Sequence, residues 1–423
     1  MKNPERLFAV LFVAIALCTT GCPEVGGSKE NSPPEIPWGP VPADGALNQE
    51  LDLTLTWKCD DPDGDLVLFD IYFGPENPPP LVQSKTLMKS FQVSGLKPNH
   101  TYYWRVKADD LKTDAVEGPL WSFTTGDEGL ALVGSHPPLD RADDVYVFEN
   151  MAYVADGKYG GLQVIDVSDP AEPVQIAEAA SLGSAEGLYV TLIDNTPHVF
   201  LAEGSAGLTV FDVSSPTIPY LSGNIDVEDN VKAVKVKNTT AFLAATENMI
   251  VVDVSDPSDP VEIGRRSIPG SGLAITIAGD MAYVGTQSQG IQVLGISNPS
   301  NPIFQHGYGS EASITGLSTA GNVLYAANEE NGLLILDISV TPFEKFALLP
   351  TPGIASDVYA LGTTVLIADY NSILVVDASK PEDPKVVGRY RGLDFVTSIH
   401  ALDAEIIYAA DLEAGLLIFE PTQ

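Results

Sequence analysis

The 423-residue sequence has few cysteines and few basic residues. Its 3 Cys exclude a disulfide-rich scaffold. Only 22 Lys and Arg stand against 57 Asp and Glu, which gives a formal charge of −35. Such a charge excludes the basic surface that nucleic acid requires, and it disfavours electrostatic attraction to anionic lipid. The 5 His form no HExxH pair, and no G-x-S-x-G elbow or phosphate-binding glycine loop is present. We therefore expect no catalytic residues and predict that the protein is not an enzyme.

Long apolar runs are also scarce, and the one at the N-terminus is too short to span a membrane. Residues 7–17 are uncharged and follow the basic Lys2 and Arg6, as in the apolar region of a signal peptide. The segment that ends at Cys22 resembles a bacterial lipobox, which implies a signal peptide over 1–21 and a lipid on Cys22. An ordinary cleaved signal peptide is the alternative. The Pro- and Gly-rich residues 22–39 then form a flexible tether.

Residues 40–127 are predicted to form a small β-sandwich. Leu51, Leu53, Leu55 and Trp57 alternate along one strand face. The module resembles a bacterial fibronectin type III domain, on Trp57, the sequence GLKP at 95–98, Tyr102 at the position of a tyrosine corner, and GPLWSFTT at 118–125. The resemblance implies a spacer or a binding module.

The turn DPDGD at 61–65 places three carboxylates at alternate positions. Asp61, Asp63 and Asp65 would offer oxygen ligands to Ca²⁺. No Glu follows at EF-hand spacing, and an ordinary Asp/Gly-rich hairpin loop is the alternative interpretation.

Residues 128–423 are a repeat array. A short apolar motif recurs seven times, ending at Asp166, Asp212, Asp253, Gly295, Asp337, Asp377 and Glu420. The mean spacing is about 42 residues, the length of a four-stranded propeller blade. The last unit lacks a fourth strand, and residues 129–135 form an orphan strand before the first unit. The array is therefore predicted to be an all-β, seven-bladed propeller in which 129–135 complete the last blade.

The closest copies of the motif are MIVVDVSDPSDP at 249–260 and GLQVIDVSDPAEP at 161–173. They resemble the LVIVD repeat family, which implies a β-propeller on secreted or surface proteins and no single activity. The repeated Asp ends a strand before a turn, and we expect its carboxylate to accept the turn's backbone N–H groups. Seven small residues end the second strands and predict tight packing near the ring centre.

The position after each small residue is often acidic. It supplies the candidate ligand face Asp156, Glu203, Asn328, Asp369 and Asp411. In a propeller this loop shares a face with the blade connections, so an acidic arc there would bind a cation or a basic partner. Solvation of ordinary surface carboxylates is the alternative. His400 lies in an innermost strand, and strand alternation favours a position between blades over one facing the channel.

These features predict a lipid-anchored binding scaffold of the bacterial cell envelope, at the outer membrane or cell surface. We expect a protein or glycan partner, contact with the membrane through the lipid alone, no nucleic acid and no cofactor other than Ca²⁺. Two alternatives remain: a metal-dependent hydrolase with its site at the channel mouth, and a structural spacer in an envelope assembly.

Overall fold

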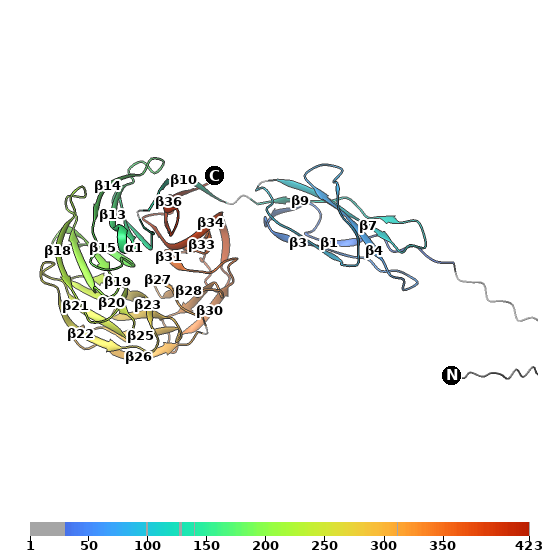
Figure 1. Ribbon diagram of the computed structural model, residues 1–423. Coiled ribbons are helices and arrows are strands. Elements are labelled where there is room, and N and C mark those ends of the chain that lie inside the picture. Colours follow the sequence, from blue (N-terminus) through green and yellow to red (C-terminus); the bar gives the residue numbers. More distant parts are fainter. Residues whose placement is uncertain (1–29, 99, 127–128, 139, 311, 423) are drawn as a thin grey trace, which may run out of the picture. The chain divides into compact units, whose positions relative to one another are not determined.

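The computed structural model describes residues 30–98, 100–126, 129–138, 140–310 and 312–422. The chain divides into two compact units, Met1–Gly126 and Asp127–Gln423 (Figure 1). The signal-peptide, Cys22 and early tether predictions lie outside the described residues. Among the residues that are described, no helix is long and apolar enough to cross a membrane.

The first unit consists of two sheets that enclose one core. The smaller sheet has the order β1 (Trp38–Val41), β3 (Leu53–Lys58), β6 (Ser90–Val93). The larger has the order β2 (Ala46–Gln49), β9 (Trp121–Thr125), β7 (Thr101–Asp109), β4 (Leu68–Gly74), β5 (Leu81–Thr86), with β8 (Val116–Glu117) beside β7.

Alternation along the strands explains the core of this unit, because every second side chain points inward. Leu55, Trp57 and Trp104 are almost fully buried, and the Trp57 ring packs edge-on against Phe69 at 5.5 Å. The Tyr102 hydroxyl accepts the backbone N–H of Lys97 at 3.0 Å, the contact expected of a tyrosine corner. These contacts tie the chain before β7 to the core.

The second unit is built from consecutive antiparallel sheets arranged around an axis (Figure 1). Five described sheets have four strands each, in chain order: β11 (Asp144–Phe148), β12 (Met151–Asp156), β13 (Gly161–Asp166), β14 (Val174–Ala179); β15 (Gly187–Ile193), β16 (Thr196–Ala202), β17 (Leu208–Asp212), β18 (Tyr220–Ile225); β19 (Val231–Lys237), β20 (Thr240–Ala245), β21 (Asn248–Asp253), β22 (Val261–Ser267); β23 (Gly272–Ala278), β24 (Met281–Thr286), β25 (Ile291–Gly295), β26 (Ile303–Tyr308); β27 (Gly316–Ala320), β28 (Val323–Ala327), β29 (Leu333–Asp337), β30 (Glu344–Leu349). A one-turn helix, α1 (Gly157–Gly160), lies between β12 and β13.

The remaining sheet has seven strands and joins the two ends of the array. Its order is β10 (Leu130–His136), β36 (Gly415–Pro421), β35 (Ile407–Asp411), β34 (Lys385–Ala401), β33 (Tyr370–Asp377), β32 (Thr364–Ala368), β31 (Asp357–Leu361). The long β34 pairs with β33 through its first half and with β35 through its second half. The first strand of the unit, β10, pairs antiparallel with the last, β36.

The strands nearest the axis form a closed cycle. Each of β11, β15, β19, β23, β27 and β31 contacts the next, β31 contacts β34, and β34 contacts β11. Apolar clusters of the unit combine residues from adjacent sheets, such as Phe200 with Val252 and Val154 with Tyr408. Burial between the sheets therefore holds the ring together.

The repeated Asp stabilises a turn in each copy, as the sequence predicted. In Asp166, Asp212, Asp253, Asp337 and Asp377, one side-chain oxygen accepts the backbone N–H two residues later, at 2.8–2.9 Å. The structural interpretation of this Asp is confirmed. It ends the third strand and sets the direction of the chain into the fourth.

The outer pair of strands carries a register shift in each sheet of the ring, for example between Val164 and Ile165, and between Leu132 and Gly134 where β10 meets β36. A Cβ on Gly134 would lie 2.0 Å from the backbone oxygen of Pro170 in the neighbouring sheet. A Cβ on Gly223 would lie 2.5 Å from the oxygen of Pro257 in the same way. Glycine at these positions lets the proline-rich turn of one sheet approach the outer strand of the sheet before it.

Candidate functional site

The residues after the second strands are buried, not exposed. Asp156, Glu203 and Asp369 have no exposed surface, and Asn328 and Asp411 are 4% and 1% exposed. The prediction that these residues form an exposed acidic ligand face is therefore wrong. The reason is that their side chains point into the protein and bind the backbone of the connecting loops. Glu203 accepts the backbone N–H of Leu182 at 3.1 Å, and Asp369 accepts that of Gly353 at 2.8 Å.

The other members of this set have the same role. Asp156 accepts the N–H of Asp140, Asp411 accepts that of Phe395, and Asn328 accepts the hydroxyl proton of Ser310. Each side chain thus holds the segment that leads into the innermost strand of its own sheet. These carboxylates satisfy backbone donors that would otherwise be buried without acceptors.

The small residues at the ends of the second strands pair directly with the innermost strands. Ala155 lies opposite Asp144, Ala368 opposite Asp357, and Ala410 opposite Ser398. The register is the same in the other sheets, where the innermost partners are Gly187, Ala233, Ala274 and Gly316. One layer of innermost residues around the axis therefore has three adjacent polar side chains and four small ones.

A cavity of ≈ 500 Å³ lies on the axis, below this layer. It is lined by residues from every innermost strand, including the three polar residues above, Tyr146, Tyr189, Lys235, Thr276, Ser318, Tyr359 and His400. A smaller cavity of ≈ 140 Å³ lies on the other side and shares Asp144, Lys235, Asp357 and Ser398 with the first. The three polar residues thus form a floor between two axial cavities.

Asp144 and Asp357 share one serine hydroxyl. Ser398 Oγ lies 2.6 Å from Asp144 Oδ1 and 3.1 Å from Asp357 Oδ2. A hydroxyl has one proton, so it donates to one of the carboxyls and must accept a proton from the other. Asp144 also accepts the N–H groups of Val145 and Leu188, which favours its ionised form.

The second carboxyl is the one that holds the proton. Burial raises the pKa of Asp357 to about 7, and the negative charge of Asp144 adds to the shift. Burial also raises the pKa of Asp144, but the hydrogen bonds from Ser398 and Leu188 act against it. Near pH 7 Asp357 is therefore partly protonated, and in its protonated form it can donate to Ser398 while Ser398 donates to Asp144.

Lys235 is the cation of the same cavity. Its ammonium nitrogen lies 4.9 Å from the centroid of the Tyr189 ring, a cation–π contact. Burial lowers the pKa of Lys235, while the charges of Asp144 and Asp357 act in the opposite direction. Among the described residues, no carboxylate oxygen lies within 4.0 Å of this nitrogen, and the Lys235 ammonium donates no hydrogen bond. Its three N–H donors are available to a ligand.

His400 faces the axis, so its predicted position between blades is wrong. Its ring lies 4.1 Å from that of Tyr146 and 4.5 Å from that of Tyr359, both on neighbouring innermost strands. His400 Nδ1 accepts the backbone N–H of Val147 at 3.3 Å, so Nε2 carries the proton of the neutral ring. Burial lowers the pKa of His400 to about 3. Nε2 has no hydrogen-bond partner among the described residues.

The sequence contains a signal for this cavity that repetition of the motif does not show. The polar residues are not repeated in every unit, because they occupy equivalent positions in only some of the innermost strands. Counting two residues back from Tyr146, Tyr359 and His400 gives Asp144, Asp357 and Ser398. Alternation within each strand places both layers on the axis.

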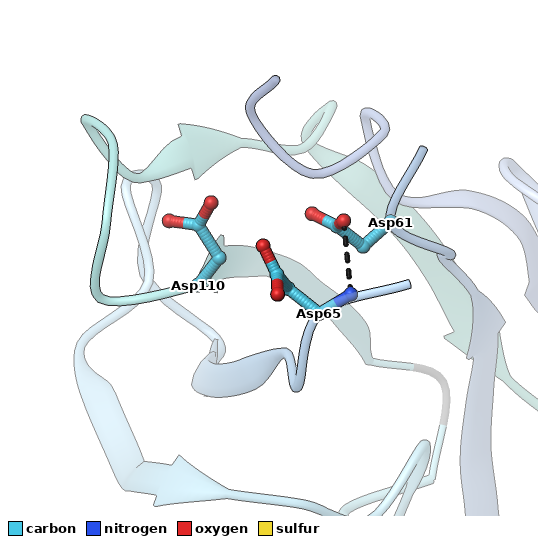
Figure 2. A group of neighbouring side chains, drawn as sticks. All are labelled: Asp61, Asp65 and Asp110. Atoms are coloured by element: carbon cyan, nitrogen blue, oxygen red, sulfur yellow. Dashed lines mark hydrogen bonds between the residues drawn. The ribbon is translucent and has the colours of Figure 1, made fainter. Parts of the chain in front are cut away.

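A second cluster lies in the first unit, where Asp61, Asp65 and Asp110 converge (Figure 2). One ligand atom from each lies within 4.8 Å of the others. Asp61 Oδ1 accepts the backbone N–H of Asp65 at 3.1 Å, and Lys112 forms an ion pair with Asp65. The predicted ligand Asp63 is not in this group, because its side chain accepts the backbone N–H of Ser32 at 2.6 Å. Asp110, on the loop after β7, was missed because sequence spacing does not show that the two loops meet.

The only cysteine in the described part of the chain is structural. Cys59 is buried, and its thiol donates to the backbone oxygen of Glu35 at 3.2 Å. Burial raises the pKa of Cys59 to about 11, so the thiol stays protonated and unreactive at neutral pH.

A family model described as "LVIVD repeat" matches the chain at residues 141–178, 198–227, 230–266, 269–309, 314–341 and 352–392. No curated protein matches the chain.

Solved structures resemble the chain in fold. The β-propeller domain of Cps50 (Swd1) from Myceliophteria thermophila is 14% identical, with a TM-score of 0.55 over 69% of this chain and 100% of that one. The WD40 β-propeller domain of Doa1 is 9% identical, with a TM-score of 0.54 over 70% and 98%. The computationally designed Ika8 protein is 12% identical, with a TM-score of 0.52 over 77% and 94%. These likenesses confirm the predicted all-β, propeller-like fold.

Proposed function

The chain belongs to the LVIVD repeat family, and from that starting point we propose that it is a non-catalytic binding scaffold whose axial cavity receives a small polar ligand. Repeat propellers are scaffolds, and pockets of 300–1,000 Å³ with a few convergent polar groups are typical ligand sites. The observation that carries the proposal is the ≈ 500 Å³ axial cavity in which Lys235 and His400 keep unused donors.

The proposed architecture has seven blades. The innermost strands β11, β15, β19, β23, β27, β31 and β34 contact in a cycle, and β34 serves two consecutive blades. In this account β10 supplies the fourth strand of the last blade, which removes free edges. Residues 40–127 form the fibronectin type III-like module that we propose as a spacer. The tyrosine corner at Tyr102 supports that assignment.

We place the protein in the bacterial cell envelope, anchored through a lipid on Cys22 and facing the outer membrane or cell surface. The basic and apolar residues before Cys22 support this proposal. The partner in this setting is a protein or a glycan. The alternative of a metal-dependent hydrolase was motivated by the acidic arc, and it loses its basis because those side chains are buried.

A melt of residues 23–423 against small polar compounds tests the binding role. All 4 Trp lie in the first unit, at positions 38, 57, 104 and 121, so tryptophan fluorescence reports that unit alone. Circular dichroism then reports the propeller, which dominates the strand content. We expect some compounds to raise the propeller transition and leave the tryptophan transition unchanged. If no compound in a broad polar set raises the propeller transition, the binding role is wrong.

We also propose that Asp61, Asp65 and Asp110 hold a Ca²⁺ ion in the first unit. The specific observation is that Asp61 Oδ2 and Asp65 Oδ2 are buried and have no hydrogen-bond partner among the described residues. Carboxylate oxygens are the ligands that Ca²⁺ prefers, and a bound cation would satisfy both.

The tryptophan transition provides the test for Ca²⁺. We expect Ca²⁺ to raise it relative to chelator, and Asp110→Asn to abolish the rise. Asp52→Asn is the matched control, since Asp52 accepts the N–H of Gly95 on another loop. An equal transition with Ca²⁺ and with chelator would show that the cluster is an ordinary loop whose charge Lys112 balances.

A further inference from the structure

The second layer of axial residues has two chemically different sides. On four adjacent innermost strands it presents the rings of Tyr189, Tyr146, His400 and Tyr359, which contact one another in that order at 5.1, 4.1 and 4.5 Å. On the other three strands it presents Lys235, Thr276 and Ser318. A ligand that fills this cavity therefore meets an aromatic wall on one side and polar groups on the other.

The polar side has hydrogen-bond capacity that the protein does not use. Ser318 Oγ accepts the backbone N–H of Ala360 at 3.0 Å, which leaves its own proton free to donate. Among the described residues, the Lys235 ammonium makes a cation–π contact with Tyr189 and no hydrogen bond. The next lysine along the strand, Lys237, is already engaged by the backbone oxygen of Gly279 and by Asp280. Lys235 is thus the available cation inside the cavity.

An internal ammonium that lacks an ion pair is costly, and an anionic group on a ligand removes that cost. Neither carboxyl of the floor takes this role. The carboxylate of Asp144 already accepts hydrogen bonds from the Ser398 hydroxyl and from the backbone N–H groups of Val145 and Leu188. Asp357 Oδ2 accepts the backbone N–H of Ile399 and lies 3.1 Å from Ser398 Oγ, and burial raises the pKa of Asp357 to about 7. The complement of Lys235 is therefore a negative charge that enters with the ligand.

The aromatic wall selects the rest of the ligand. The faces of aromatic rings are electron-rich and attract the slightly positive C–H groups of a saturated ring. The hydroxyls of such a ring would find donors in Ser318 and His400 Nε2–H, and acceptors at the carboxyl floor. A cavity of ≈ 500 Å³ has room for one or two sugar rings, and the floor at Ser398 prevents a longer chain from passing through.

We propose that the axial cavity binds a hexuronic acid, either free or as the terminal residue of a short glycan, with its carboxylate on Lys235 and its ring against Tyr146 and Tyr359. This inference rests on the proposed binding function of the cavity and names its ligand class. The overall charge of −35 restricts the choice to a ligand with one or two carboxylates, since a long polyanion would be repelled.

Titration calorimetry with the full mature chain at neutral pH tests the proposal. The probes are D-glucuronate and D-galacturonate, each against the neutral sugar with the same ring, D-glucose or D-galactose. Benzoate and inorganic phosphate serve as anions without a sugar ring. We expect at least one uronate to bind ten-fold or more tightly than its neutral counterpart and than either simple anion.

Substitution of the lysine assigns the effect to the cavity. Lys235→Met keeps the length of the side chain and removes the charge, and we expect it to reduce uronate binding to the level of the neutral sugar. Lys345→Met is the matched control, because Lys345 lies exposed on the outer strand β30. The propeller transition of each variant establishes that it is folded.

The outcomes separate this inference from the function on which it rests. Equal binding of acidic and neutral sugars, or of uronate and benzoate, would overturn the uronate assignment and keep the cavity as a binding site. If no sugar binds but other polar compounds still raise the propeller transition, the uronate assignment is likewise wrong and the cavity remains a binding site. Failure of every compound to bind or to stabilise the propeller would overturn the proposed function itself.

Discussion

The proton shared by Asp144, Ser398 and Asp357 makes the stability of the propeller depend on pH in an unusual direction. The folded pKa of Asp357 lies near 7, above the ordinary carboxyl value of 3.8. The folded state therefore binds this proton more tightly than the unfolded chain does. The stabilisation is fully present below pH 4 and is lost as the pH rises through about 7.

The size of the effect follows from the shift in pKa. One pKa unit corresponds to about 1.4 kcal/mol. Asp357 has a pKa of 3.8 in the unfolded chain and about 7 in the folded one, so its titration lowers the free energy of unfolding by roughly 2.5 kcal/mol between pH 5 and pH 8. Asp357→Asn removes the titrating proton, so the variant lacks this slope. An amide at this position cannot both accept the N–H of Ile399 and donate to Ser398 from one atom, so the absolute stability also falls.

Urea unfolding of the propeller, followed by circular dichroism between pH 5 and pH 8, measures the slope. Wild type should lose about 2.5 kcal/mol more than Asp357→Asn over this interval. Asp337→Asn is the matched control. The hydrogen bonds from Ser339 lower the pKa of Asp337, so its titration falls below the interval. Parallel pH profiles for wild type and Asp357→Asn would refute the shared proton.

Three further predictions concern the framework around the cavity. Glu203→Ala should destabilise the propeller by about 1–3 kcal/mol, because the Leu182 N–H and the Thr209 hydroxyl lose a buried acceptor. An unchanged urea midpoint would mean that water already satisfies these donors. Tyr102→Phe should cost the first unit about 1 kcal/mol in tryptophan-monitored unfolding, through loss of the bond from Lys97 N–H, and a shift in the propeller transition instead would contradict this. If β10 closes the ring, Leu130→Ala should destabilise the propeller by about 2–5 kcal/mol, since Leu130 is only 5% exposed. Leu132→Ala is the control: Leu132 lies on the same strand but is 41% exposed, so its loss should destabilise the propeller much less. Equal destabilisation by the two variants would argue against closure through β10.

The propeller-like fold could be predicted because the information is repeated. Each copy of the motif places a strand and a turn, and the Asp at its end makes the same hydrogen bond in all five copies that have it. Errors in one unit are corrected by the others. The small residues opposite the innermost strands, such as Ala155 and Ala410, were recognised for the same reason.

The candidate site was mispredicted because a function-bearing side chain need not repeat. The acidic residues after the second strands recur, and this recurrence predicted an acidic ligand arc. It reflects a structural role instead, because Glu203 and Asp369 accept hydrogen bonds from the backbone of the loops that precede the innermost strands. Asp144 and Asp357 stand at a position where four of the other innermost strands have glycine or alanine. Lys235 stands two residues further along, at a position where other innermost strands have Tyr, His, Thr or Ser. Only the closed ring brings them together.

The same limit applied to the first unit. The alternate carboxylates of residues 61–65 indicated a cation loop, but the third carboxylate of the cluster comes from Asp110, on a loop that the sequence does not connect with it. Asp63 was chosen on spacing alone, and the direction of its side chain depends on Ser32, which lies in the segment before the sandwich.

The central claim is that the axial cavity is the binding site, and blocking it is the most direct test. Thr276 lines the cavity and is 7% exposed, and its side chain makes no hydrogen bond among the described residues. Thr276→Phe therefore fills the space without removing a side-chain polar contact. Native mass spectrometry of wild type and Thr276→Phe, each with the compound that most raises the propeller transition, measures occupancy. The account predicts one bound molecule per wild-type chain and none in a folded Thr276→Phe variant. Equal occupancy in the two proteins would contradict it.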